Sequence, residues 1–128
     1  MRHEHAESCT THNMVRLVGM LLRASGGALT YADFIERALL CHQSGNVFFV
    51  HAAADPMLPP ESQTPETLLW GHPEFPARRR GDGRWVVHGH VVVNEPMARD
   101  GIIAIDTGAY FSHRLTAARI EPGKVSFL

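Results

Sequence analysis

The chain has 128 residues, 45% of them hydrophobic and 20% charged, with 12 basic against 13 acidic side chains. This is the length of one domain or part of one, and the apolar content argues against a disordered chain. The balanced charge gives no indication of a nucleic-acid or membrane partner. Two cysteines are too few for a disulfide framework and indicate a reducing compartment, so we expect a cytoplasmic protein.

The first third of the chain predicts a tail and two helices. Residues 1–12 are polar and unpatterned, so we expect a poorly ordered tail before a domain over residues 13–128. Apolar residues dominate residues 13–22, which predicts a short helix. A second helix begins at Thr30, with a capping-box-like start and an apolar stripe down one face, and residues 43–46 end it.

The middle of the chain predicts a buried strand and then a short helix. The run 47–50 (VFFV) is continuously apolar, which favours a strand buried on both faces of an α/β sheet. Four prolines then exclude regular structure until Thr64, which reads as the N-cap of a helix with Leu68, Leu69 and Trp70 on its buried face. Residues 71–84 are predicted to form a loop.

Short strands dominate the rest of the chain. They are expected at residues 85–87, 91–93, 102–105, 115–120 and 125–128. The Pro122-Gly123 pair favours a type II turn between the last two. Helices followed by strands indicate an α/β fold.

Three of these apolar strands end in histidine or aspartate. His51 follows the first, His88 and His90 follow the second, and Asp106 follows the third. Side chains just past strand ends project into the crevice where open α/β sheets bind ligands. A single histidine in such a place is more often structural, but three strand ends together favour a metal or phosphate site. Imidazole and carboxylate without thiolate suit manganese, iron or zinc in a hydrolytic site.

Several motifs resemble a known family. They are VFFVHAAADP, LLW, VVHGH, IDTGAY and RLTA. In order and spacing, from about Phe34 to Leu128, they resemble the C-terminal half of bacterial and phage-type serine/threonine protein phosphatases, which are calcineurin-like metallophosphoesterases. The resemblance implies the C-terminal part of an αββα sandwich whose N-terminal half is missing.

The resemblance also implies a function. Family members hold two divalent metals, here expected to be manganese, and a metal-activated water hydrolyses a phosphomonoester of a phosphoprotein. His51 and His90 are implied to be ligands of the second metal. His88 is implied to lie near the site or at the surface, and Asp106 to support its loop through hydrogen bonds. Tyr110 is implied either to contact substrate or to be a packing residue.

Other family motifs are missing. GDxHG, GDxxDRG and RGNHE do not occur in the chain, so ligands of the first metal and the acid for the leaving oxygen are absent. We therefore expect no complete catalytic set and no activity of the chain alone. His72 stands where the family has a phosphate-binding arginine. Arg78, Arg79 and Arg80 are candidates to replace it, although a solvated basic run is the simpler interpretation.

Three functions stay open. The first is a phosphatase whose N-terminal half lies upstream or on another polypeptide. The second is a non-catalytic remnant that binds metal, phosphate or a partner. The third is a symmetrical dinucleoside tetraphosphatase, against which the IDTGAY and RLTA motifs argue. The missing half also predicts an aggregation-prone or oligomeric product, because strands 47–50 and 85–87 would expose their edges.

Overall fold

A computed structural model describes residues 40–128. The chain divides into two units, Met1–Leu39 and Leu40–Leu128, and only the second is described. The tail predicted at residues 1–12 and the helix predicted at residues 13–22 lie outside the described residues, as does most of the helix predicted from Thr30 onward.

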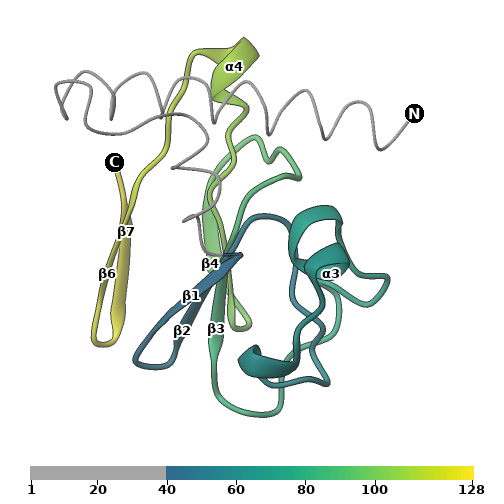
Figure 1. The fold of residues 1–128 in the computed structure, drawn as a ribbon. Coiled ribbons are helices and arrows are strands. Elements are labelled where there is room, and N and C mark those ends of the chain that lie inside the picture. The colour runs from purple at the N-terminus through teal and green to yellow at the C-terminus, as the bar shows by residue number, and fades with distance from the viewer. Residues whose placement is uncertain (1–39) are drawn as a thin grey trace, which may run out of the picture. The chain divides into compact units, whose positions relative to one another are not determined.

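A five-stranded mixed sheet is the centre of the described unit (Figure 1). In chain order its strands are β1 (Cys41–Ser44), β2 (Val47–Val50), β3 (Trp85–His88), β4 (Met97–Arg99) and β5 (Ile102–Ala104). Their order in the sheet is β1-β2-β3-β5-β4. The central strands β2, β3 and β5 are parallel to one another. The edge strands β1 and β4 are antiparallel to their neighbours β2 and β5. The predicted α/β class is therefore confirmed at this level.

Strand β1 corrects the prediction for the residues after Leu40. Residues 43–46 were expected to end a helix, but Ser44 pairs with Val47 across a two-residue hairpin loop. Gly45 has a φ of 57° in this loop, and no positive φ occurs at Asn46, which is the pattern of a type II′ turn. Gly-Asn between two short runs is a hairpin signal, so this strand was detectable in the sequence.

The connection from β2 to β3 contains a short 3-10 helix, η1 (Pro60–Ser62), and the helix α3 (Pro65–Trp70). The Thr64 side chain accepts a hydrogen bond from the backbone N–H of Thr67, and Pro65 occupies the first turn. The predicted N-cap is thus confirmed. Only Leu68 is fully buried, whereas the expected partners on its face are partly exposed.

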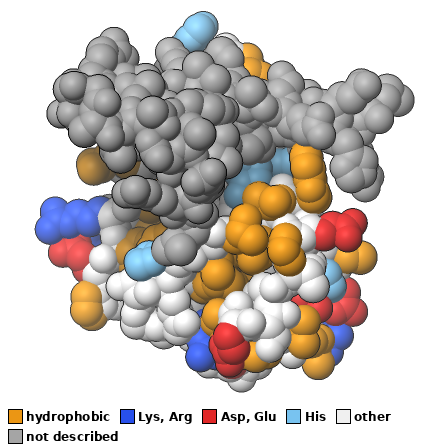
Figure 2. Space-filling view, viewed as in Figure 1, with side chains coloured by type: hydrophobic (Ala, Val, Ile, Leu, Met, Phe, Trp, Pro, Cys, Tyr) orange, Lys and Arg blue, Asp and Glu red, His pale blue; other side chains and the backbone are white. Residues whose placement is uncertain are grey.

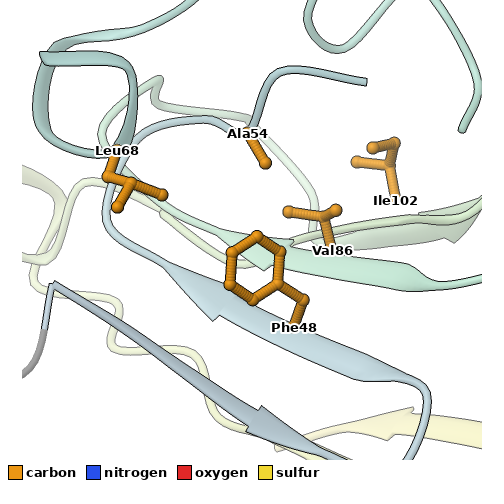
Figure 3. Close-up of a cluster of buried hydrophobic side chains, with 5 residues drawn as sticks. All are labelled: Phe48, Ala54, Leu68, Val86 and Ile102. Atoms are coloured by element: carbon orange, nitrogen blue, oxygen red, sulfur yellow. The ribbon is translucent and has the colours of Figure 1, made fainter. Parts of the chain in front are cut away.

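One face of the sheet packs against this connection. Phe48 on β2, Val86 on β3 and Ile102 on β5 stand in register on that face. They form a buried cluster with Ala54 and with Leu68 of α3 (Figure 3). The cluster is buried and apolar, so it holds the three parallel strands and the crossover in fixed relative positions.

The opposite face is buried on two strands. Val87 and Ile103 alternate with the cluster residues and are 5% and 1% exposed. Burial on both faces therefore holds for β3 and β5, while on β2 only Phe48 is fully buried. The predicted exposure of the long edges of β2 and β3 is wrong, because each has a paired neighbour on both sides.

The last part of the chain forms a separate hairpin of β6 (Ala118–Glu121) and β7 (Lys124–Phe127). The predicted turn is confirmed, with Gly123 at a φ of 73°, as type II requires at that position. A four-residue helix, α4 (Ala109–Ser112), precedes the hairpin and was not predicted.

The strand predicted at residues 91–93 does not form. The backbone leaves the sheet at Gly89, and His90 is the central residue of a γ-turn with a positive φ of 67°. The N–H of Val91 then turns back to the carbonyl of Gly89, at 2.8 Å. Three consecutive valines favour a strand, but this turn moves them out of reach of the sheet ladder.

The described surface mixes apolar and charged side chains. In the view of Figure 2, hydrophobic side chains gather near the middle of the coloured surface, and acidic and basic ones lie toward its periphery. Among residues 40–128, no helix has the length and apolar character needed to cross a bilayer.

Candidate functional site

The carboxyl ends of the parallel strands meet at one edge of the sheet, as the sequence pattern predicted. His51 follows β2, His88 ends β3 with His90 two residues later, and Asp106 lies two residues after β5. The parallel pairing of β2, β3 and β5 brings these ends to the same edge.

Backbone hydrogen bonds join the three strand ends. The N–H of Gly89 donates to the carbonyl of His51 at 2.9 Å. The N–H of Ile105 donates to the carbonyl of His88 at 3.2 Å. Farther along, the carbonyl of Asp106 accepts from the N–H of Val93 at 2.8 Å. The loops that carry the histidines are therefore positioned by the sheet itself.

The rings of His51 and His90 lie next to each other. Their centroids are 5.1 Å apart and their planes make an angle of 63°. The Trp70 ring, at the end of α3, flanks His90 with a centroid distance of 6.5 Å. Two imidazoles from separate strand ends and one indole from the crossover helix thus share one place at the sheet edge.

The spacing of the two rings suits a shared cation. A metal ~2.1 Å from a ring nitrogen lies about 3.2 Å from the ring centroid. Two imidazoles on one metal, at roughly right or tetrahedral angles, then have centroids about 4.5–5.2 Å apart. The observed separation falls in this interval. Two donors make only part of a site, however, and no group of three or more metal-ligating side chains occurs within residues 40–128.

Burial sets the charge of the histidines at this edge. Burial lowers the pKa of His51, and the neighbouring His90 lowers it further, while the Asp106 carboxylate opposes both. Burial also lowers the pKa of His88, against the opposing effects of its bond to Gly89 and of Asp106. Both side chains are therefore neutral at pH 7, and neutral imidazole is the form that binds metal.

Asp106 supports the loop that follows it. Its Oδ1 accepts a hydrogen bond from the N–H of Gly108 at 2.9 Å. Gly108 has a φ of 68°, and a Cβ added there would lie 2.6 Å from Cζ of Phe111. The loop therefore requires glycine at this position and uses the aspartate as its internal acceptor.

His88 is a buried residue of β3 and is not at the surface. It is 4% exposed, and the Phe75 ring packs edge-on against it at 4.8 Å. Its Nδ1 lies 3.1 Å from the Gly89 carbonyl, while its buried Nε2 has no hydrogen-bond partner among the described residues. Its Cα pairs with that of Ala104 on β5, so it lies within the ladder and not beyond it.

His72 is held by two neighbours in the crossover. Its Nε2 is 3.4 Å from a carboxylate oxygen of Asp55, and its Nδ1 accepts from the N–H of Glu74. Both ring nitrogens are thus engaged within the crossover. The second candidate for substrate contact, Tyr110, lies on α4, where its ring packs against Phe111 at 4.8 Å.

The arginine run divides into buried and exposed members. The Arg80 guanidinium donates to the carbonyls of Asp55 and Leu58, at 2.8 and 2.7 Å, and to the carboxylate of Asp82. This buried arginine is a structural clamp, which corrects the interpretation of the whole run as solvated. Arg78 and Arg79 are exposed, as that interpretation expected. The sequence carries no local signal for this clamp, because its carbonyl partners lie 22–25 residues earlier in the chain.

Comparison of the chain with models of protein families, with curated proteins and with solved structures yields no match. The described unit is a mixed α/β domain with a five-stranded mixed sheet and few helices. Its candidate site is the pair of imidazoles, those of His51 and His90, at the carboxyl edge of that sheet.

Proposed function

We propose that this chain supplies two ligands, His51 and His90, to a divalent metal in a phosphomonoester hydrolase of the serine/threonine protein phosphatase type. The observation that carries the proposal is the 5.1 Å separation of the two rings, which come from different strand ends. Manganese is the proposed metal, as the family resemblance implies, with iron and zinc as alternatives because the two proposed donors are imidazoles rather than thiolates.

The charge state of the site supports this proposal. The lowered pKa of His51 keeps a lone pair available for a cation at neutral pH. The Asp106 carboxylate lies beside Gly89, since a Cβ added to that glycine would be 3.5 Å from Oδ2. A negative charge at this position favours a cation at the edge. A divalent cation bound there would neutralise phosphoryl oxygens and lower the pKa of a bound water.

The architecture supports a role as part of a larger site. The sheet, with α3 on one face, is proposed to be one layer of an αββα sandwich. Catalytic metal sites use three or more protein ligands, so two histidines do not complete one. We therefore place the remaining ligands outside the described residues, on another segment or another polypeptide. Phosphoserine or phosphothreonine of a phosphoprotein is the proposed substrate.

Metal binding is the first test. Free Mn²⁺ is titrated against the full chain by electron paramagnetic resonance, with His3, His5 and His12 replaced by asparagine to remove adventitious binding by the tail. His51→Ala and His90→Ala are each expected to weaken Mn²⁺ binding by about 10–100-fold or more. Replacing a residue that only orients a metal ligand already lowers metal affinity by ~10–100-fold. His42→Ala is the matched control, since this histidine is exposed on β1. Equal affinities in all three variants would contradict the proposal.

Activity is the second test. An upstream reading frame that encodes GDxHG and RGNHE would be joined to this chain and assayed with Mn²⁺ on a phosphoserine peptide. We expect hydrolysis that His51→Ala abolishes. Metal binding without hydrolysis would leave a non-catalytic metal protein, and preferred cleavage of a dinucleoside polyphosphate would indicate a tetraphosphatase.

A further inference from the structure

A second concave feature lies in the crossover between β2 and β3. It is an open groove of about 530 Å³, a volume within the ~300–1,000 Å³ range of ligand sites. One wall is the proline-rich segment 56–59, and the other is formed by residues 78–82 with Arg84. We call it the arginine groove. It contains none of the histidines of the proposed metal site, so it is independent of the proposed function.

The Arg80 clamp holds the two walls together. It binds the carbonyls of Asp55 and Leu58 on one wall and the carboxylate of Asp82 on the other. Gln63 fixes the proline-rich wall on its own side, because its amide donates to the same two carbonyls, at 3.0 and 2.9 Å. A groove fixed from both sides loses little conformational entropy when a ligand binds.

The groove carries an excess of positive charge. Four arginines and one carboxylate, that of Asp82, line it. Arg80 and Arg84 both contact this carboxylate, at 2.6 and 3.0 Å, and Arg80 holds the pKa of Asp82 far below its ordinary value. Asp82 therefore stays ionised and balances only one of the four cations.

The two outer arginines remain available to a ligand. Arg78 makes an exposed pair with Glu74 at 3.2 Å, which contributes little to stability and is readily exchanged. Arg79 is exposed, and no carboxylate of residues 40–128 lies within ion-pair distance of it. The excess contrasts with the formal charge of −1 for the whole chain.

The opposite wall offers apolar contact. Met57 is 63% exposed at the rim of the groove, between two prolines that are more buried. Its flexible thioether can pack against side chains of different shapes. A cationic wall facing an apolar wall is complementary to a ligand that carries both carboxylates and apolar groups.

We propose that the arginine groove binds an acidic peptide segment of a partner protein. Carboxylates of the segment pair with Arg79 and Arg78, and an apolar side chain of the segment packs on Met57. A nucleic acid is disfavoured because its affinity depends on many phosphate contacts, and only these two outer guanidiniums are available in the groove.

The test measures binding of a fluorescein-labelled octapeptide of alternating glutamate and leucine to the full chain by fluorescence anisotropy. Arg79→Glu is expected to weaken binding about tenfold, because it removes an attraction and adds a repulsion. Arg79→Gln is expected to weaken it about threefold. Arg99→Glu is the matched control, since this arginine is 75% exposed on β4, away from the groove lining, and a change within twofold is expected.

Further measurements distinguish the proposed peptide site from the proposed metal site. The double variant His51→Ala, His90→Ala is expected to bind the peptide with unchanged affinity, whether or not it binds Mn²⁺. Equal effects of Arg79→Glu and Arg99→Glu would overturn the proposal. So would equal affinity for the octapeptide with glutamine in place of glutamate, or tighter binding of a twelve-residue oligodeoxythymidine.

Discussion

The carboxyl edge of the sheet and the arginine groove differ in the charge of the side chains that form them. At the edge, burial keeps His51 and His88 neutral, so the site presents lone pairs. In the groove, the guanidiniums stay charged at every accessible pH, and Arg80 and Arg84 keep Asp82 ionised. A site that offers the neutral imidazole of His51 suits a cation, whereas an open site made of fixed cations suits an anion.

Replacing Arg80 is expected to have the largest effect, and to affect the arginine groove but not the metal site at the carboxyl edge. Arg80→Ala removes a charged donor from two carbonyls, which keep the Gln63 amide, and from the Asp82 carboxylate, which keeps Arg84. The Arg80 side chain is 5% exposed. We expect a loss of about 3 kcal/mol in the free energy of unfolding, because two part-buried hydrogen bonds from a charged donor are lost and each is worth about 1.5–3 kcal/mol. Urea denaturation measures this loss.

The same variant has a distinguishing control. Arg99→Ala removes an exposed arginine and is expected to change the free energy of unfolding by less than about 0.5 kcal/mol. If the variants Arg80→Ala and Arg99→Ala unfold at the same urea concentration, the clamp does not hold the groove. Under native conditions Mn²⁺ affinity should survive Arg80→Ala, while affinity for the acidic octapeptide should fall.

A smaller effect is expected at the loop after Asp106. Gly108→Ala places a Cβ against the Phe111 ring at a positive φ, which requires a shift of that ring or of the backbone. The left-handed conformation alone costs about 1–2 kcal/mol for a residue with a side chain. Gly123→Ala is the matched control, because its φ is 73° and a Cβ there meets nothing within 4 Å.

The difference between these two glycine variants measures the contact with Phe111. Thermal unfolding monitored by circular dichroism should give the lower midpoint for Gly108→Ala. Adding Phe111→Ala should bring the midpoint of Gly108→Ala close to that of Gly123→Ala, after correction for Phe111→Ala alone. A midpoint for Gly108→Ala at or above the control would show that the loop does not depend on this glycine.

The smallest expected effect is the dependence of the stability of the folded chain on pH. Because the pKa values of His51 and His88 are lowered in the folded chain, the unfolded chain binds more protons near pH 6. Stability contributed by these groups is present above their unfolded value of ~6.5 and is lost as pH falls through that value toward the folded values. Urea midpoints at pH 7.5 and pH 5.5 should therefore differ, with the lower one at pH 5.5.

A histidine variant tests whether this pH dependence arises at the carboxyl edge of the sheet. His88→Gln is expected to flatten the dependence of the urea midpoint on pH, whereas the control His42→Gln leaves it unchanged. Peptide binding in the groove should hardly change between these pH values, because the arginines and Asp82 do not titrate there. If the urea midpoint of His88→Gln changes with pH as much as that of the unmodified chain, His88 does not contribute to the pH dependence.

Local patterns predicted much of this fold. The apolar runs located β2, β3 and β5, and the Thr64-Pro65 pair located the start of α3. Because the runs are parallel neighbours, their following residues had to meet at one edge, so the approach of His51 and His90 was predictable. These features depend on periodicity and on capping, both of which act over a few residues.

Features set by distant contacts were not predictable in the same way. The valines at residues 91–93 have high strand propensity, but the γ-turn at His90 removes them from the sheet. Arg80 reads as part of a basic surface run until the segment 22–25 residues earlier folds against it. Tertiary contacts override local preference at both places.

The positive φ of His90 has an evolutionary consequence. Glycine would adopt this positive φ without the steric cost of a Cβ. Substitution by glycine would therefore relieve backbone strain while discarding the imidazole and its ring contacts with His51 and Trp70. Selection for a relaxed backbone alone would not maintain histidine here, so a lineage that retains the ring does so for the contacts or the ligands of the imidazole.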